Sequence, residues 1–163
     1  MTRRPARKAN SNEPAGPPPA GPPYVGALLR LSWQRVRRHI DEAVRAKGFT
    51  DLRDAHLAVF SYPPPDGVRL SDLARQLRMS RQATNYLVGQ LEELDYLERR
   101  AAPGSERRLI HLTARGRKVV AALHASLRAL QAQWAREIGR ERFADFMEVL
   151  RILSTQAPPS PAG

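Results

Sequence analysis

Apolar residues recur every three or four positions in two long stretches of the chain, which is the spacing of one helix face. The two stripes are Val25, Leu29, Trp33, Val36, Ile40 and Val44, and then Val119, Leu123, Leu127, Leu130, Trp134 and Ile138. Gly48 follows the first stripe as a C-cap, Thr113 precedes the second as an N-cap, and Gly139 breaks the second helix. One more helix is expected from Phe143, Phe146, Met147, Leu150 and Leu153.

Short elements are expected between the two stripes. Thr50 or Asp51 caps a helix that runs to about Tyr62, because the block 63–67 (Pro-Pro-Pro-Asp-Gly) cannot continue it. Ser71 caps the next short helix, which has Leu73, Ala74 and Leu77 facing inward.

A helix-turn-helix and a hairpin complete the pattern. The turn at 78–80 is followed by a longer helix, which Ser80 caps and which runs to about Leu94. Two strands and their turn are expected at 96–100, 108–112 and 102–105. The predicted fold is mainly α with a small β-wing: a winged helix-turn-helix domain between long N- and C-terminal dimerisation helices.

Composition adds a partner class. Lys and Arg number 27 against 16 Asp and Glu, a formal net charge of +11. A chain this basic attracts polyanions, so nucleic acid or an anionic membrane surface is the natural partner. No cysteine occurs, which excludes disulfides and thiolate metal sites. The lack of cysteine also fits a cytoplasmic location, which is expected here. No apolar run is long enough to span a membrane, and no apolar stretch follows Arg3 and Arg4 as it would in a secretory signal.

The ends of the chain differ in composition from its middle. Residues 1–23 hold seven of the 14 prolines and four cations, which predicts a disordered basic arm that is either a solvated tail or a contact to DNA phosphates. A second disordered tail is expected at 156–163. The folded domain between them has three expected parts, at 24–62, 67–113 and 114–155.

The polar side of the second helix of the helix-turn-helix carries the groups that read DNA. The residues that point away from its apolar side or flank it are Arg81, Gln82, Asn85, Tyr86 and Gln90. Gln and Asn can bond an adenine edge, Arg a guanine edge, and Tyr can reach a phosphate. The wing adds four arginines suited to the minor groove or to flanking phosphates, namely Arg99, Arg100, Arg107 and Arg108.

Cations also cluster at the start of the helix after the wing. Arg115, Arg117 and Lys118 lie where the helix dipole is already positive. Such a placement costs stability locally, which indicates that an anion normally lies nearby.

Four segments together resemble the MarR family of winged helix-turn-helix regulators. They are Leu70-Ser-Asp-Leu-Ala, Met79-Ser-Arg-Gln-Ala, Leu91-Glu-Glu-Leu-Asp-Tyr-Leu-Glu-Arg-Arg and His111-Leu-Thr-Ala-Arg-Gly-Arg. The resemblance covers about residues 24–155. It implies a homodimer with interlocking N- and C-terminal helices, which reads a near-palindromic operator and can respond to a small aromatic or anionic effector. The expected mechanism is occupancy of a promoter, which either blocks or recruits polymerase, and a repressor is the favoured of these two alternatives.

Two positions depart from the family pattern. The family usually has Gly just after the recognition helix, where a left-handed backbone is wanted, whereas this chain has Asp95. The wing turn is shortened, so that Ser105-Glu106-Arg107 is the nearest match to the family's Asp-x-Arg. Arg107 is therefore expected to be the wing-tip arginine, with Arg108 as the competitor.

No enzyme is indicated by the remaining residues. The histidines His39, His56, His111 and His124 have no metal-ligand spacing, and no catalytic triad, phosphate loop or cofactor motif is present. His56 is the one candidate for contact with an effector, against the alternative of an ordinary packed histidine. Two other functions stay open: a winged-helix protein-interaction module, and a DNA-binding protein without sequence specificity.

Overall fold

The computed structural model describes residues 21–60, 67–101, 104 and 108–155. Several expectations lie outside these residues: most of the Pro-rich arm, the end of the second helix at Tyr62, nearly all of the wing turn with Arg107, and the tail at 156–163. The described residues form six helices and one two-stranded antiparallel sheet. In chain order they are α1 (Val25–Ala46), α2 (Asp54–Val59), α3 (Leu70–Leu77), α4 (Arg81–Glu93), β1 (Leu97–Ala101), β2 (Arg108–Leu112), α5 (Ala114–Ile138) and α6 (Arg140–Thr155).

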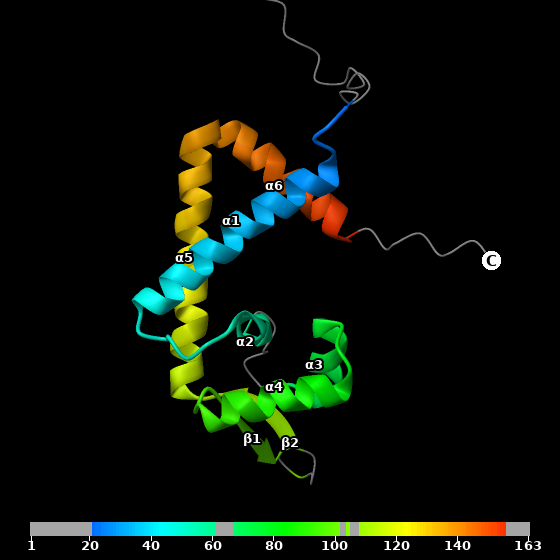
Figure 1. Cartoon of the computed structure of the whole chain (residues 1–163), viewed down its shortest axis with the longest axis vertical. Coiled ribbons are helices and arrows are strands. Elements are labelled where there is room, and N and C mark those ends of the chain that lie inside the picture. The colour runs from blue at the N-terminus through cyan, green and yellow to red at the C-terminus, as the bar shows by residue number, and fades with distance from the viewer. Residues whose placement is uncertain (1–20, 61–66, 102–103, 105–107, 156–163) are drawn as a thin grey trace, which may run out of the picture.

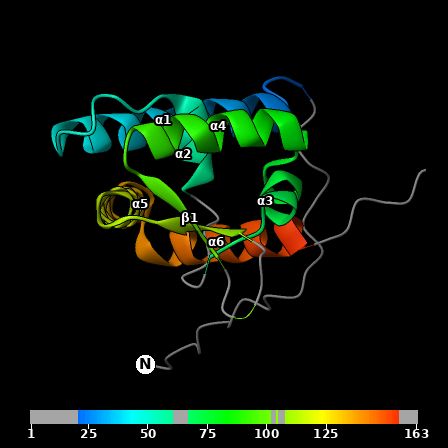
Figure 2. The ribbon, with the colours of Figure 1, turned by 90° about the horizontal axis from the view of Figure 1, so that it is seen from below.

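The long helix α5 connects two parts of the molecule (Figure 1). At one end α1 crosses α5, and α6 folds back against α5 after Gly139, whose φ is +94°. At the other end lie α2, α3, α4 and the hairpin of β1 and β2. Figure 2 looks along α5 and shows α1 and α6 on opposite sides of it. The predicted architecture, a winged helix-turn-helix between long N- and C-terminal helices, is confirmed.

The core of the winged part is built around the ring of Tyr96, which is fully buried. The rings of Phe49 and Phe60 meet it edge-on, with centroids 6.2 and 5.9 Å away. These aromatic groups come from the loop after α1, the end of α2 and the start of the wing. The cluster of these three rings therefore packs the start of the wing against α2 and the loop that follows α1.

Two of the expected N-caps are present and two are wrong. Ser80 accepts a hydrogen bond from the backbone N–H of Ala83 at 3.1 Å, and Thr113 accepts one from Gly116 at 3.0 Å, as expected. Ser71, however, lies inside α3, which begins one residue earlier at Leu70.

The start of α2 also differs from the expectation. Neither Thr50 nor Asp51 caps this helix, which begins at Asp54 with Arg53 in the cap position. The side chain of Asp51 is bound elsewhere, to Tyr96 and Arg115. In its place the imidazole of His56 accepts the backbone N–H of Arg53 at 3.2 Å.

The junction between the wing and α5 depends on close backbone approach. A Cβ on Gly116 would lie 2.1 Å from the carbonyl oxygen of Tyr96, so only glycine fits there. Asp95 has the left-handed conformation expected of it, with φ of +59°. Its carbonyl accepts the hydroxyl of Thr113 at 2.6 Å, which ties the end of the recognition helix to the start of α5. Val68 forms an extra β-bridge with Ile110, which sequence reasoning did not find.

Candidate nucleic-acid interface

The recognition helix α4 is held by its apolar side and by the turn that precedes it. Arg78 takes a left-handed conformation in that turn, with φ of +54°. The hydroxyl of Thr84, which is fully buried, donates to the carbonyl of Ser80 at 3.0 Å. Thr84, Leu87, Val88 and Leu91 are all buried. Because this side of α4 is held in the core, the opposite side of the helix faces solvent.

The structure brings four of the predicted DNA-reading residues together on that outer side. Arg81, Gln82, Asn85 and Tyr86 are all exposed. Gln82, Asn85 and Tyr86 line one surface hollow with Ser80 and Ala83. Because these side chains lie side by side on the exposed face of α4, they can enter a major groove together.

The amide groups differ in how far they are already engaged. The amide of Gln82 has no hydrogen-bond partner among the described residues, so both of its ends can meet a base edge. The carbonyl oxygen of Asn85 accepts from Arg99 at 2.8 Å, which leaves its NH₂ group to donate. Gln90 is half-buried and is bonded at both ends, to His56 and Tyr86. Gln90 thus flanks the apolar side of α4, and its contact with DNA stays a prediction.

Three of the four wing arginines lie within the described residues, and two of them are paired. Arg99 forms an ion pair with Glu92 at 2.9 Å, and Arg100 pairs with Glu98 on its own strand. The hydrogen bond from Arg100 holds the pKa of Glu98 below its ordinary value. Arg108 is exposed and has no acidic partner among the residues described. The Arg100 pair was detectable in the sequence, because residues two apart on a strand share a face.

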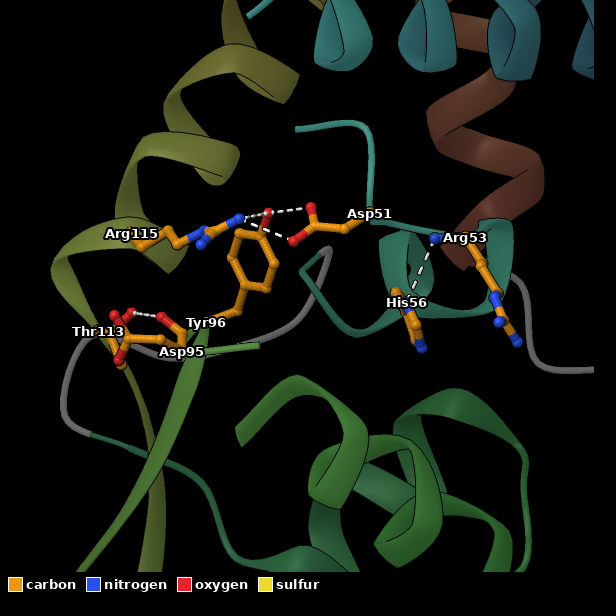
Figure 3. A network of polar contacts seen from close by, with 7 residues as sticks. All are labelled: Asp51, Arg53, His56, Asp95, Tyr96, Thr113 and Arg115. Atoms are coloured by element: carbon orange, nitrogen blue, oxygen red, sulfur yellow. Dashed lines mark hydrogen bonds and ion pairs between the residues drawn. The ribbon is translucent and has the colours of Figure 1, made fainter. Parts of the chain in front are cut away.

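A polar network at the base of the wing joins three distant segments (Figure 3). The hydroxyl of Tyr96 donates to Asp51 at 2.6 Å, and Arg115 donates to the same carboxylate at 2.7 Å and to the Tyr96 oxygen at 3.0 Å. The guanidinium also lies 4.4 Å from the centre of the tyrosine ring. Burial raises the pKa of Tyr96 above its ordinary value, and the hydrogen bond to Asp51 raises it further.

This network contains the anion that the cations at the start of α5 led us to expect. The cations at the start of α5 indicated a nearby anion, and for Arg115 that anion is Asp51 of the same chain. The residues are 64 positions apart, so no local pattern could have paired them. The guanidinium of Arg117 finds a partner close by, the carbonyl of Leu112 at 2.8 Å.

A cavity of about 430 Å³ lies between α1, α2 and α5. Its lining is mostly apolar, with one ion pair, and consists of Trp33, Arg37, Ile40, Asp54, Ala55, Leu57, Ala58 and Leu123. Arg37 and Asp54 are paired with each other. His56, the residue that the sequence suggested for effector contact, does not line this cavity. Its ring is directed toward α4, as Figure 3 shows, and is only 3% exposed.

Comparison with known proteins agrees with this geometry. Residues 62–108, which include α3, α4 and β1, match the sequence profile of the MarR family. This segment of the chain is therefore similar in sequence to the MarR family. The family resemblance expected from the four sequence segments is therefore confirmed. No curated protein sequence matches the chain.

Several solved structures share the fold of this chain along most of their own length. CouR from Rhodococcus jostii RHA1, solved with p-coumaroyl-CoA, has a TM-score of 0.63 and 20% identity over 82% of this chain and 94% of its own. A MarR-family protein of Mycobacterium tuberculosis, solved with salicylic acid, has a TM-score of 0.58 and 26% identity over 80% and 96%. A mutant of MepR from S. aureus, bound to an oligodeoxyribonucleotide, has a TM-score of 0.56 and 18% identity over 81% and 97%.

The described residues hold neither a metal-site cluster nor a helix that could span a membrane. Within the described ranges, no cluster of three or more His, Asp or Glu side chains has the arrangement of a metal site. None of the helices in this part of the chain is both long and apolar enough to cross a membrane.

Proposed function

We propose that this chain is a sequence-specific DNA-binding transcription regulator, a repressor that acts as a homodimer on a near-palindromic operator. The observation that carries the proposal is the outer side of α4, where Arg81, Gln82 and Asn85 are exposed beside one another on a helix whose other side is core. In this proposal α4 enters the major groove, and Arg108 and the rest of the wing contact the flanking backbone or minor groove. MepR, which shares the fold, has been solved with an oligodeoxyribonucleotide.

The test of base reading uses Gln82. Its replacement by Ala removes a side chain that can bond an adenine edge at two points, and we expect a loss of about 1–3 kcal/mol on the cognate duplex and almost none on random duplexes. Gln131→Ala is the matched control, since Gln131 is exposed on α5, away from the recognition helix. Equal losses on cognate and random DNA would show that Gln82 does not read bases.

The dimer is supported by apolar surface that this chain alone leaves uncovered. No residue of α6 is buried, although its sequence carries several large apolar side chains. The exposed large apolar residues of α1, its N-cap and α5–α6 are Tyr24, Val25, Leu28, Leu29, Leu31, Trp33, Ile138, Val149, Ile152 and Leu153. A second copy that covers these faces would remove them from water.

Sedimentation equilibrium tests the dimer, and Ile152→Glu is the informative variant. Ile152 is 51% exposed, so a carboxylate there costs little in an isolated chain but much in an apolar interface. We expect a wild-type dimer at micromolar concentration and a weakened dimer in the variant. A folded wild-type monomer under these conditions would contradict the proposal.

The cavity between α1, α2 and α5 is proposed to take a small aromatic or anionic effector that releases the protein from DNA. Its volume is within the range of ordinary ligand sites, and Trp33 and Arg37 offer an aromatic face and a cation. Two proteins of this fold have been solved with p-coumaroyl-CoA and with salicylic acid. Titration of the protein–DNA complex with salicylate tests the idea, with Arg37→Met expected to weaken the response.

A further inference from the structure

The exposed hydroxyl of Tyr86 is connected to the buried start of α2 by a chain of hydrogen bonds. Nδ1 of His56 accepts from the backbone N–H of Arg53 at 3.2 Å, and Nε2 of His56 lies 3.0 Å from Oε1 of Gln90. Nε2 of Gln90 in turn donates to the hydroxyl oxygen of Tyr86 at 3.1 Å. His56 is 3% exposed, whereas Tyr86 is 67% exposed. The chain thus runs from the protein interior to the outer side of the recognition helix.

The direction of donation along this chain is set at its inner end. A backbone N–H can only donate, so Nδ1 of His56 carries no proton and the single proton of the neutral ring is on Nε2. Nε2–H then donates to the carbonyl oxygen of Gln90. This orients the NH₂ group of Gln90 toward Tyr86, whose oxygen accepts. The O–H of Tyr86 is consequently left to donate outward.

Each link has a partner that keeps it in place. Both ring nitrogens of His56 are bonded, and rotating the ring would leave buried polar atoms unsatisfied, which is costly. Gln90 is bonded at both ends of its amide, and reversing the amide would set two N–H groups against each other. Hydrogen bonds that all donate in the same direction also polarise one another, which makes the hydroxyl of Tyr86 a stronger donor.

We propose that His56 and Gln90 are positioning residues that present the Tyr86 hydroxyl as a hydrogen-bond donor to an acceptor on DNA. The acceptor is a phosphate oxygen or an acceptor atom on a base edge, and a donor group of a base would be rejected. The proposal rests on the DNA-binding function proposed above. It gives Gln90 a different role from direct base contact. The helix α2, which carries His56, also lines the cavity with Ala55, Leu57 and Ala58. The series of hydrogen bonds therefore joins the wall of the cavity to the outer side of α4.

A double-mutant cycle on DNA affinity tests the proposal. Tyr86→Phe removes the donor and should weaken binding about tenfold, as expected for a hydrogen bond to a charged or strongly polar acceptor. Gln90→Met keeps the shape but releases the tyrosine, and should weaken binding severalfold in the wild-type background. In the Tyr86→Phe background the same change should alter affinity less than about twofold, because the hydroxyl that it positions is gone.

Gln90→Glu reverses the last link and sharpens the cycle. One carboxylate oxygen can still accept from His56, but the other can only accept from Tyr86, which turns the tyrosine proton inward. We expect binding at least as weak as that of Tyr86→Phe. Repulsion between the new charge and DNA is the same in both backgrounds, so the cycle separates it from the loss of donation. Gln131→Met on α5 is the control.

Two classes of duplex identify the acceptor. A phosphate acceptor predicts that Tyr86→Phe weakens binding to selected and random duplexes alike, whereas a base acceptor predicts a loss on selected duplexes only. Thermal melts followed by circular dichroism check that each variant is folded.

A measurement without DNA tests the direction of hydrogen-bond donation from His56 to Tyr86. Long-range ¹H–¹⁵N correlation spectra of the wild type should show His56 as the neutral tautomer with its proton on Nε2, and Gln90→Met should keep this tautomer because the backbone N–H of Arg53 still donates to Nδ1. A proton on Nδ1 in the wild type would overturn the inference. So would Gln90 substitutions that cost as much in the Tyr86→Phe background as in the wild type. A wild type that binds no duplex would instead refute the proposed function, which keeps the two failures apart.

Discussion

The network of Tyr96, Asp51 and Arg115 predicts a large stability effect for the removal of one oxygen atom. Tyr96→Phe deletes the hydroxyl that donates to Asp51 at 2.6 Å and accepts from Arg115 at 3.0 Å. The phenyl ring can keep its edge contacts with Phe49 and Phe60. The change therefore isolates the polar contribution from the packing of the ring.

The magnitude follows from the partners of the lost group. A hydrogen bond to a charged group is worth about 1.5–3 kcal/mol, and here the donor is fully buried. The pair of Asp51 and Arg115 is half-exposed and survives the substitution, so its own contribution is not lost. We expect the free energy of unfolding to fall by about 2 kcal/mol.

Urea unfolding followed by far-UV circular dichroism at fixed protein concentration measures this loss. Tyr24→Phe is the matched control, because it removes the same atom from a residue that is 70% exposed, and should change stability by less than about 0.5 kcal/mol. Equal effects of the two substitutions would refute the reasoning.

The pH dependence provides an independent check. The pKa of Tyr96 in the folded protein is raised above 10.0, chiefly by burial. Above that pH the unfolded chain loses the proton more readily than the folded one, so the stabilisation is complete below about pH 10 and declines as the pH rises further. The stability difference between wild type and Tyr96→Phe should therefore shrink above about pH 10. A difference that grows in this range would contradict the account.

Four further substitutions test the recognition helix, the wing and the junction of the wing with α5. Gly116→Ala places a Cβ 2.1 Å from the carbonyl oxygen of Tyr96 and should lower the free energy of unfolding by about 1–3 kcal/mol. Gly89→Ala, at an open position within α4, should raise the free energy of unfolding by up to about 1 kcal/mol. Urea unfolding measures both changes. Asp95→Gly relieves a left-handed conformation and should raise the melting temperature; a lower one would contradict the strain argument. Arg108→Ala should flatten the slope of log affinity against log salt by about 1 per wing, and an unchanged slope in the folded variant would exclude a phosphate contact.

The elements of the fold could be predicted from the sequence because their signals are local. The caps at Ser80 and Thr113, the break at Gly139 and the left-handed residue Asp95 are each set by a few neighbouring residues. The start of α2 was missed because tertiary contacts override the local preference. Asp51 has a good capping side chain, but its carboxylate is bound by groups from the wing and α5.

The outer side of α4 was equally predictable, because helical periodicity alone separates Gln82 and Tyr86 from the buried residues. What periodicity could not give is which polar groups are already engaged. Gln90 lies at the edge of the apolar side and meets His56, 34 residues away, so its role depends on how α2 packs. The pairing of Arg99 with Glu92 has the same origin, since it joins the wing to α4.

Selection of duplexes from a random-sequence library by the wild-type protein tests the central claim most directly. A homodimer that reads bases through two copies of α4 predicts enrichment of an inverted repeat whose half-sites are about one helical turn apart. It also predicts a selected duplex that binds about a thousandfold more tightly than random DNA at physiological salt. Binding that depends on salt but enriches no sequence would contradict sequence-specific recognition. An absence of binding to any duplex would favour a winged-helix module that contacts protein instead.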